Sequence, residues 1–537
     1  MTVTNSNNTA SGKPKEKYTV KQALVNYYLL VMFTLFPLFF TDAYFNIRHD
    51  KYYFFLIATG LVIVAEFLLV MSANVDKKPE EQRLEKPKTK PFYKTLSFMD
   101  MAFIAFLGIN VISTLLSQSP YDALLGTQGR NNGLLLMAFY TAAYFLITRC
   151  FKYFEYIFVA LAFGSILVYL LAVLNSFYID PLGMFSQLTD KRTITDFSST
   201  IGNKNLLSSY ICIALPVTTA LSVITEKNIY RAVYLAANAL GFMSLMTADS
   251  DSGILGMGVF MVVYFVWFLR KITRLKRFFL SASVMLLAAK VLRLFSLLMN
   301  DNNKGFDRFQ EIFVFSNVGW VLFAVCVVIT ALLYLLDYKK SGIVLPKAVP
   351  IAVGIFFGVC AAAVIGVVIY FSCIDTKTHL GDLSKIIRFN DKWGTHRGFM
   401  WIRSIWIFGD SSFIEKLFGV GPDMFYTAFQ PYFSELSKYG DGSTNAAHNE
   451  YLNYLITIGL TGLASYLAIV GGTIANAVKY SEKNPMTIVA VSAVICYAVQ
   501  SVVNLYQPIT TPLFFIFIAI CEAFVRSTKS KESEQSV

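Results

Sequence analysis

Two side chains suited to acid–base and anion chemistry, His448 and Arg397, stand in one polar stretch between apolar segments of the chain. An imidazole is the side chain most readily poised as a general base near neutral pH. The planar guanidinium group of Arg donates two charge-assisted hydrogen bonds at once to a diphosphate. We therefore expect His448 and Arg397 to be catalytic, as the base and the diphosphate-binding cation of one site.

The sequence around these residues also has an ordinary explanation. Apolar residues recur at helical spacing over 395–408, so we expect an amphipathic helix at the membrane surface, where Arg397 and Arg403 could lie among lipid headgroups. His448 stands at the mouth of a long apolar run, where a lone His is often structural. The functional interpretation adds Arg403, Asn449 and Glu450 as substrate-binding residues.

Two short motifs place Gly, Asn and a single cation immediately before an apolar run: GTQGRNNGLL at 126–135 and SSTIGNKNLLSSY at 198–210. Gly and Asn are ordinary turn and capping residues. Exposed backbone N–H groups at a helix N-terminus can also cradle an anion or a sugar when a cation lies beside them. In that interpretation the substrate-binding residues are Arg130, Asn203, Lys204 and Asn205.

Two further cations, Lys290 and Arg293, fall inside an apolar run and three residues apart, which puts them on one face of a helix. An intramembrane cation is a functional candidate by default. Arg293 could instead extend its guanidinium to the outer interface. We expect both residues to contribute to substrate binding.

A metal site is the other interpretation of His379, His396 and His448. Their spacing matches no HExxH or similar ligand pattern, so we predict neither a metal nor a cofactor. The seven Cys residues fall within or at the ends of apolar runs and form no CxxC pair. They are typical of buried small hydrophobic residues rather than of disulfides.

The composition indicates a membrane protein. Of the 537 residues 55% are hydrophobic and 15% charged, whereas soluble domains have about 45–50% apolar and about 25% charged residues. The net charge of +12 would suit nucleic-acid binding, but the Lys and Arg residues stand in short loops between apolar runs, where membrane topology favours them. The polar N-terminus lacks the pattern of a cleaved signal peptide, so we expect the first apolar run to stay in the membrane.

A helix needs roughly 20 residues to cross a bilayer core of about 30 Å, and the chain contains about fourteen apolar runs of that kind. The expected fold class is therefore all-α: a polytopic bundle of transmembrane helices with a long external loop that contains amphipathic helices. The predicted spans are 22–41, 52–72, 98–117, 132–149, 154–175, 205–224, 229–247, 252–271, 277–299, 314–336, 348–373, 451–475, 486–504 and 507–525.

Positive charge assigns the loops to two sides. Lys and Arg favour the cytoplasmic side, and they gather in the loops after even-numbered spans, at 77–90, 149–155, 225–228, 270–277, 337–340 and 479–484. All four His residues (His49, His379, His396 and His448) then fall on the outer face. The predicted organisation is a cytoplasmic tail (1–21), spans one to eleven (22–373), an external catalytic loop (374–450), spans twelve to fourteen (451–525) and a second cytoplasmic tail (526–537).

Five motifs follow one another along residues 198–465: Gly202-Asn203-x-Asn205, Arg397-x-x-x-Trp401, Gly419-x-Gly421-Pro422, His448-Asn-x-Tyr-Leu and Gly459-Leu-x-Gly-Leu. In this order, and all on the outer side, they resemble the superfamily of O-antigen ligases and O-antigen polymerases, which are bacterial membrane glycosyltransferases. The resemblance implies a fold of the membrane glycosyltransferase C type. It also implies metal-independent, inverting transfer of a glycan from undecaprenyl diphosphate, with His448 as the base and Arg397 as the diphosphate ligand.

One motif departs from the family. A second Arg usually follows a Ser or Thr at the turn that opens the eighth span, but this chain has Asp249-Ser250-Asp251-Ser252-Gly253 there. Arg130, Lys290 and Arg293 are the candidates to replace it.

The expected function is O-antigen ligase-like transfer to an acceptor hydroxyl on the outer face of the bacterial cytoplasmic membrane. The expected partners are the lipid-linked donor, a glycan or lipid acceptor and membrane lipids, with no nucleic acid. A polysaccharide polymerase would use the same chemistry. A transporter of lipid-linked glycans could have as many spans, but the halves of the chain share no repeated motif of the kind that transporters tend to have. A structural scaffold of the cell envelope is the third possibility.

Overall fold

The fold is helical throughout the described part of the chain. The computed structural model describes residues 18–42, 46–75, 95–127, 130–300, 302–440 and 442–535, and every regular element in these ranges is a helix. One isolated antiparallel bridge joins Lys271 and Val344. The predicted all-α class is confirmed. The predicted cytoplasmic loop at 77–90 and most of the tail at 1–21 lie outside the described residues.

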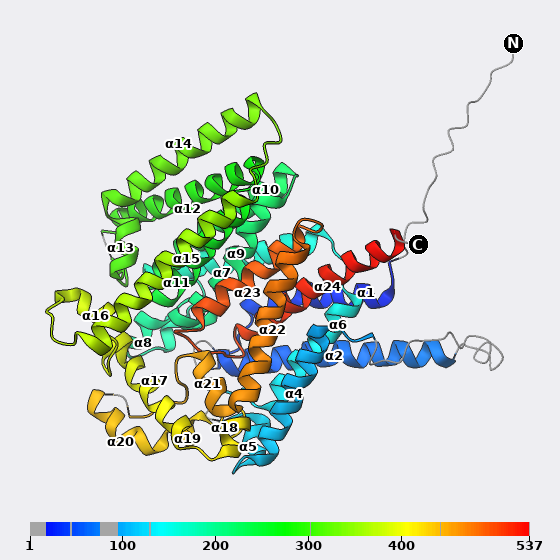
Figure 1. Ribbon diagram of the computed structural model, residues 1–537, viewed down its shortest axis with the longest axis vertical. Coiled ribbons are helices and arrows are strands. Elements are labelled where there is room, and N and C mark those ends of the chain that lie inside the picture. Colours follow the sequence, from blue (N-terminus) through cyan, green and yellow to red (C-terminus); the bar gives the residue numbers. More distant parts are fainter. Residues whose placement is uncertain are drawn as a thin grey trace.

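Thirteen of the fourteen predicted spans each overlap one long helix, and the span at 451–475 overlaps two helices (Figure 1). Within the described residues, eleven helices are long and apolar enough to cross a membrane, and α6 and α23 are shorter apolar helices; α1 is the remaining one. The protein is a polytopic membrane helical bundle. Its long helices are α1 (Val20–Leu38), α2 (Ile47–Val75), α4 (Phe98–Leu116), α6 (Leu134–Cys150), α7 (Glu155–Ser176), α9 (Lys204–Ile224), α10 (Asn228–Thr247), α11 (Asp251–Phe268), α12 (Ile272–Leu298), α14 (Asn317–Lys339), α15 (Ala348–Ile369), α22 (Gly459–Tyr480), α23 (Met486–Gln500) and α24 (Thr511–Gln535).

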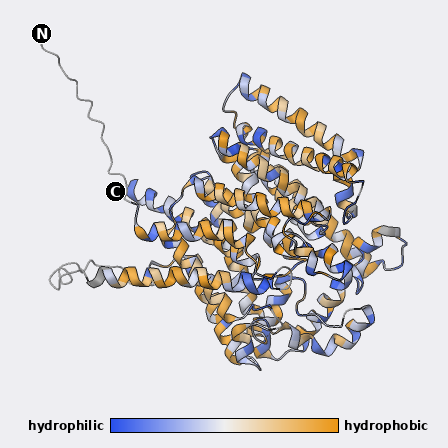
Figure 2. Cartoon of the chain, turned by 180° about the vertical axis from the view of Figure 1, so that it is seen from behind, coloured by the Kyte–Doolittle hydropathy of each residue, from blue (hydrophilic) through white to orange (hydrophobic). Residues whose placement is uncertain are grey.

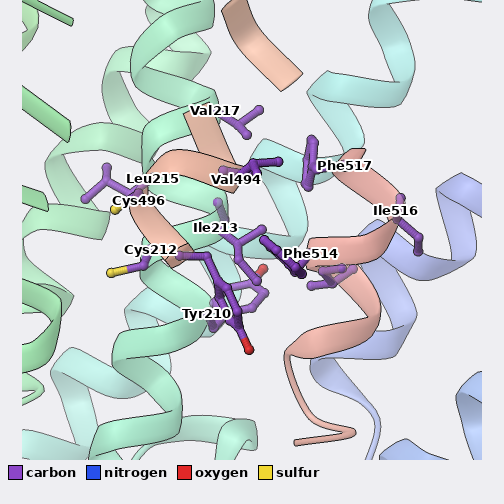
Figure 3. Packing of buried hydrophobic residues seen from close by; sticks show 14 of the residues in the cluster. Tyr210, Cys212, Ile213, Leu215, Val217, Val494, Cys496, Phe514, Ile516 and Phe517 are labelled. Carbon is purple, nitrogen blue, oxygen red and sulfur yellow. The ribbon is translucent and has the colours of Figure 1, made fainter. Parts of the chain in front are cut away.

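Helices α9, α23 and α24 form the centre of the bundle. Along its most apolar stretch α9 is 94% buried within the protein, whereas α15 is 0% buried, as expected for a helix whose apolar residues face lipid. Figure 3 shows Ile213 of α9 beside Val494 of α23 and Phe514 of α24. Hydrophobic residues run along most of the long helices (Figure 2), as expected where the surrounding solvent is lipid.

Local sequence sets where several helices begin. Thr19 and Gln22 form a capping box at the start of α1, and Ser97 and Asp100 form another at the start of α4. In each box two backbone N–H groups of the first turn find acceptors that the helix cannot supply. Asn203 caps α9 by accepting a hydrogen bond from the N–H of Asn205.

Two helices differ in extent from the predicted spans. The single span expected at 451–475 is divided into α21 (Glu450–Thr457) and α22, because the backbone breaks at Ile458 and Gly459 has a φ of 69°. Helix α24 continues to Gln535 and so includes most of the segment predicted as a C-terminal tail. Arg526 pairs with Glu522 one turn earlier and with Asp100 of α4, which supports helix where the apolar run has ended.

Short helices form the segment between α15 and α21. They are α16 (Ser384–Ile387), α17 (Trp393–Asp410), α18 (Phe413–Phe418), α19 (Phe425–Phe429) and α20 (Phe433–Leu436). Of these, α17, α19 and α20 share with α21 a small core that includes Phe399, Phe425, Phe429 and Ile456. Figure 1 places α16, α17 and α20 at the side of the bundle away from the end of α24. The amphipathic helix expected at 395–408 lies within α17, whose first residues Gly394, Thr395 and His396 have left-handed backbone angles.

Candidate functional site

His448 lies at a sharp bend just before α21. Its φ is 49°, a left-handed conformation that is uncommon for a residue with a Cβ atom. Asn449 follows and caps α21 by accepting a hydrogen bond from the N–H of Leu452 at 3.0 Å. The bend leaves the imidazole of His448 at the wall of a cavity.

Arg397 lies in the first regular turn of α17 and lines the same cavity. Within the described part of the chain no carboxylate forms an ion pair with its guanidinium, although the charge of Asp251 acts on it. Burial lowers the pKa of Arg397 and the Asp251 charge opposes that change. The group stays charged at neutral pH and can still form strong hydrogen bonds to an anion.

The cavity has a volume of about 630 Å³ and lies between the segment that joins α15 to α21 and the N-terminal ends of α9 and α11. Its lining includes Lys204 and Asn205 of α9 and the turn Asp249–Asp251. Ser443, Thr444 and Asn445, which precede α21, also line it. Its charged residues are Arg192, Lys204 and Arg397 together with Asp196, Asp249, Asp251 and Asp307. The cavity therefore carries both signs of charge.

The charged residues of the cavity differ in how free they are to bind a ligand. Lys204 pairs with Asp249 at 3.0 Å and with Asp196 at 3.3 Å, so its ammonium is largely neutralised within the protein. Burial, a hydrogen bond to Asp249 and the charge of Asp251 raise the pKa of Asp307 to about 7. Close carboxyl groups retain a proton because both cannot ionise without repulsion. Arg397 is thus better placed than Lys204 to bind an anionic ligand.

Removal of the His448 ring from bulk water and the charges of Arg130 and Arg397 lower the pKa of His448 to about 3. Its imidazole is therefore neutral at neutral pH and has a nitrogen lone pair that can accept a proton. An anion bound beside the two Arg residues would offset their charges and raise this pKa.

Arg130 lies behind the cavity wall. Its guanidinium donates a hydrogen bond to the side-chain oxygen of Asn445, which lines the cavity. Burial lowers the pKa of Arg130 to about 10, and the charge of Asp423 opposes the decrease. Of the candidates to replace the missing family Arg, Arg130 is the one whose charge acts on His448.

Lys290 and Arg293 do not line the cavity. The ammonium of Lys290 donates to the carbonyl oxygens of Val314 at 3.1 Å and Ser316 at 2.8 Å, and the guanidinium of Arg293 lies over the ring of Phe315. Both cations thus contact the segment from the end of α13 (Arg308–Val314) to the start of α14.

Arg403 and Glu450 also lie outside the lining. Arg403 pairs with Asp391 at 2.9 Å and with Glu435 at 3.1 Å, and so connects α17 to neighbouring parts of the segment between α15 and α21. The fully buried carboxyl of Glu450 accepts a hydrogen bond from Tyr466 at 2.7 Å. Burial raises the pKa of Glu450 to about 7.

Asp423 is a residue that the sequence analysis missed. Its buried carboxylate accepts hydrogen bonds from the N–H groups of Thr127 at 2.9 Å and Asn132 at 3.1 Å, and so fixes the loop that carries Arg130. Burial raises the pKa of Asp423 to about 6 despite the charge of Arg130. Its place directly after Gly421-Pro422 was the available signal, because Asp is common in turns.

Strained backbone gathers around the cavity. Asp249, Thr395 and His448 have φ values of 48°, 57° and 49°, and all three line the cavity. Such conformations persist only where surrounding contacts impose them, and they cluster at functional sites. Within the described ranges no three His, Cys, Asp or Glu side chains come together as a metal-binding group.

One part of the chain is similar to a known protein family. Residues 312–467 match the family model described as O-Antigen ligase, a range that contains Arg397, the Gly419–Pro422 motif and His448. No curated protein matches the chain. The resemblance found in the sequence is confirmed over residues 312–467, where this polytopic membrane protein is similar to the O-antigen ligase family.

Proposed function

We propose that this protein transfers a glycan from undecaprenyl diphosphate to an acceptor hydroxyl at the outer face of the bacterial cytoplasmic membrane, as an O-antigen ligase-like glycosyltransferase. The observation that carries the proposal is that His448 and Arg397 line one cavity. In the proposed topology both termini are cytoplasmic and the cavity opens to the outside. Because activated nucleotide sugars are absent there, a lipid-borne donor supplies the leaving group.

In the proposed mechanism His448 accepts the proton of the acceptor hydroxyl while its oxygen attacks the anomeric carbon. The bond from that carbon to the diphosphate oxygen breaks, and the lipid diphosphate leaves from the opposite face with the bonding electrons. The configuration is therefore inverted. His448 then releases its proton to water.

Arg397 stabilises the negative charge that grows on the leaving diphosphate, and Arg130 assists through its field. Fixed charges aimed at developing charge commonly provide the largest part of catalysis. Diphosphate binding also raises the pKa of His448, since it offsets the two Arg charges that lower it. Donor binding and activation of the base are thus coupled. No residue in this mechanism requires a metal ion.

The test is transfer by purified protein in lipid vesicles, with an undecaprenyl-diphosphate-linked glycan as the donor and EDTA present. We expect turnover in EDTA and loss of turnover in His448→Ala. His379→Ala is the matched control, because His379 is exposed and does not line the cavity. A requirement for added divalent metal, or full activity in His448→Ala, would count against the mechanism.

The same assay separates the related functions. A lipid acceptor that gains the glycan identifies a ligase, and a glycan chain that lengthens identifies a polymerase. A transporter would move the lipid carrier across the vesicle membrane without joining glycans, and that movement would survive Arg397→Ala. A scaffold would show neither activity.

A further inference from the structure

The backbone at His448 is held in an unfavourable conformation by its neighbours. A non-glycine residue with a φ of 49° relaxes unless the surrounding structure fixes the chain on both sides. After His448 the chain is fixed because Asn449 caps α21 and the N–H of Glu450 donates to the carbonyl oxygen of Ser501 at 2.9 Å. The contacts that fix the chain before His448 involve a different pair of residues.

Both backbone polar groups of Ala447, its N–H and its carbonyl oxygen, form hydrogen bonds to side chains. The indole N–H of Trp401 donates to the Ala447 carbonyl oxygen at 3.1 Å. The Ala447 N–H donates to the side-chain oxygen of Asn453 at 3.3 Å. Ala447 is fully buried, so water cannot replace either partner. The carbonyl that Trp401 holds belongs to the peptide bond that joins Ala447 to His448.

These two partners connect His448 to the rest of the site. Trp401 lies one turn after Arg397 on α17, where residues four apart share a helix face. Asn453 lies on α21 and donates to the hydroxyl of Tyr506 at 3.1 Å, and the Tyr506 carbonyl accepts a hydrogen bond from Asn132 beside Arg130.

We propose that Trp401 and Asn453 are positioning residues, which together hold His448 through Ala447 at a fixed place relative to Arg397. The proposal rests on the proposed function for its effect on the transfer rate. The placement of the imidazole is independent of that function and can be measured without turnover. Neither residue touches the substrate in this account.

The test compares two Trp→Phe substitutions on α17. Trp401→Phe removes the N–H donor and keeps an aromatic ring. Trp393→Phe is the matched control: its indole N–H donates to the Ile386 carbonyl at 2.9 Å and its ring packs against Trp401 at 5.3 Å, but Ile386 does not line the cavity. Asn453→Leu tests the other side of Ala447 and keeps the proposal open to refutation if Trp401→Phe folds poorly.

We expect Trp401→Phe and Asn453→Leu to lower kcat by at least about 10-fold, since small displacements of a catalytic group have effects of this order or larger. KM for the undecaprenyl-diphosphate donor should change by less than about 2-fold, because Arg397 remains in place. Trp393→Phe should alter neither constant. An equal loss of kcat in Trp393→Phe, or a higher KM with unchanged kcat, would overturn the proposal.

A second readout needs no turnover. Diethyl pyrocarbonate modifies neutral imidazoles, and mass spectrometry locates the modified residue, with the exposed His379 as the internal reference. Release of the bend should increase the relative reactivity of His448 severalfold in Trp401→Phe but not in Trp393→Phe. Unchanged reactivity would overturn the proposal. If wild-type protein transfers no glycan while this increase occurs, the proposed function fails and the positioning roles stand.

Discussion

Gly419 and Gly459 pack so closely that a methyl group on either would collide with the backbone beside the other. A Cβ atom on Gly459 would lie 2.4 Å from the carbonyl carbon of Leu417, and one on Gly419 would lie 2.3 Å from that of Thr457. Two of the sequence motifs thus meet at the break between α21 and α22. This contact fixes α21, the helix that begins just after His448.

Gly459→Ala should destabilise the protein and abolish transfer. The left-handed backbone at Gly459, with φ of 69°, alone costs a residue with a Cβ atom about 1–2 kcal/mol, and the collision with Leu417 adds to that cost. Thermal unfolding in detergent should show a lower Tm. Gly471→Ala on the same helix is the control, because no atom lies within 4 Å of the added Cβ. Equal Tm values for the two variants would contradict this account.

Arg397→Lys should impair use of the donor, whereas Arg403→Lys should impair stability. Lys cannot reproduce a two-bond contact with diphosphate, so Arg397→Lys should lower kcat/KM for the donor on the order of 10- to 100-fold with little change in Tm. Arg403 pairs with Asp391 and Glu435, so Arg403→Lys should reduce stability by about 1 kcal/mol and leave KM unchanged. If Arg403→Lys raised KM for the donor more than Arg397→Lys did, Arg403 rather than Arg397 would be the donor-binding residue.

The helices could be predicted from the sequence because lipid imposes long apolar runs, and all of these runs are helical, one of them with a break. The breaks could not be predicted in the same way. The division at Gly459 depends on the close approach of the Leu417 backbone, 42 residues earlier in the sequence. The hydropathy of the sequence contains no information about such a contact. The same holds for α24, which continues past its apolar run because Arg526 finds carboxylate partners.

The candidate site shows the same limit. Residue type and the order of the motifs pointed to Arg397 and His448, which the structure brings to one cavity. Residue type also pointed to Lys290, whose ammonium binds backbone carbonyls instead. Asp423 was missed because its role comes from hydrogen bonds to Thr127 and Asn132, on either side of Arg130. These residues lie far from Asp423 in the sequence, so no local pattern links them.

Glu450→Gln should remove part of the pH dependence of stability. Burial raises the pKa of Glu450 to about 7, above its value in the unfolded chain, so the folded protein binds more protons between about pH 4.5 and 7. Stability from the protonated carboxyl is present at low pH and is lost as pH rises through 7. At pH 8 the variant should therefore be more stable than wild type, by on the order of 1–3 kcal/mol, with unchanged KM for the donor.

The outcome that would contradict this role is a Glu450→Gln variant that is less stable than wild type at pH 8, or one with a higher KM. The first result would mean that the carboxylate is stabilised by its surroundings, and the second that Glu450 contacts the donor. Tm measured in detergent from pH 5 to 8 tests the first outcome, since the two proteins are expected to converge at low pH, and KM measured with the lipid-linked donor tests the second.

The ionisation of His448 should respond to the lipid diphosphate. In the free protein its pKa is about 3, through burial and the charges of Arg130 and Arg397, so histidine ring signals from labelled protein should show His448 neutral down to pH 5. Undecaprenyl diphosphate should raise the pKa by offsetting both cations, and Arg130→Gln should raise it in the free protein by removing one of them. A titration that neither the lipid diphosphate nor Arg130→Gln alters would place the diphosphate away from His448, and the coupling between donor binding and base activation would then be absent.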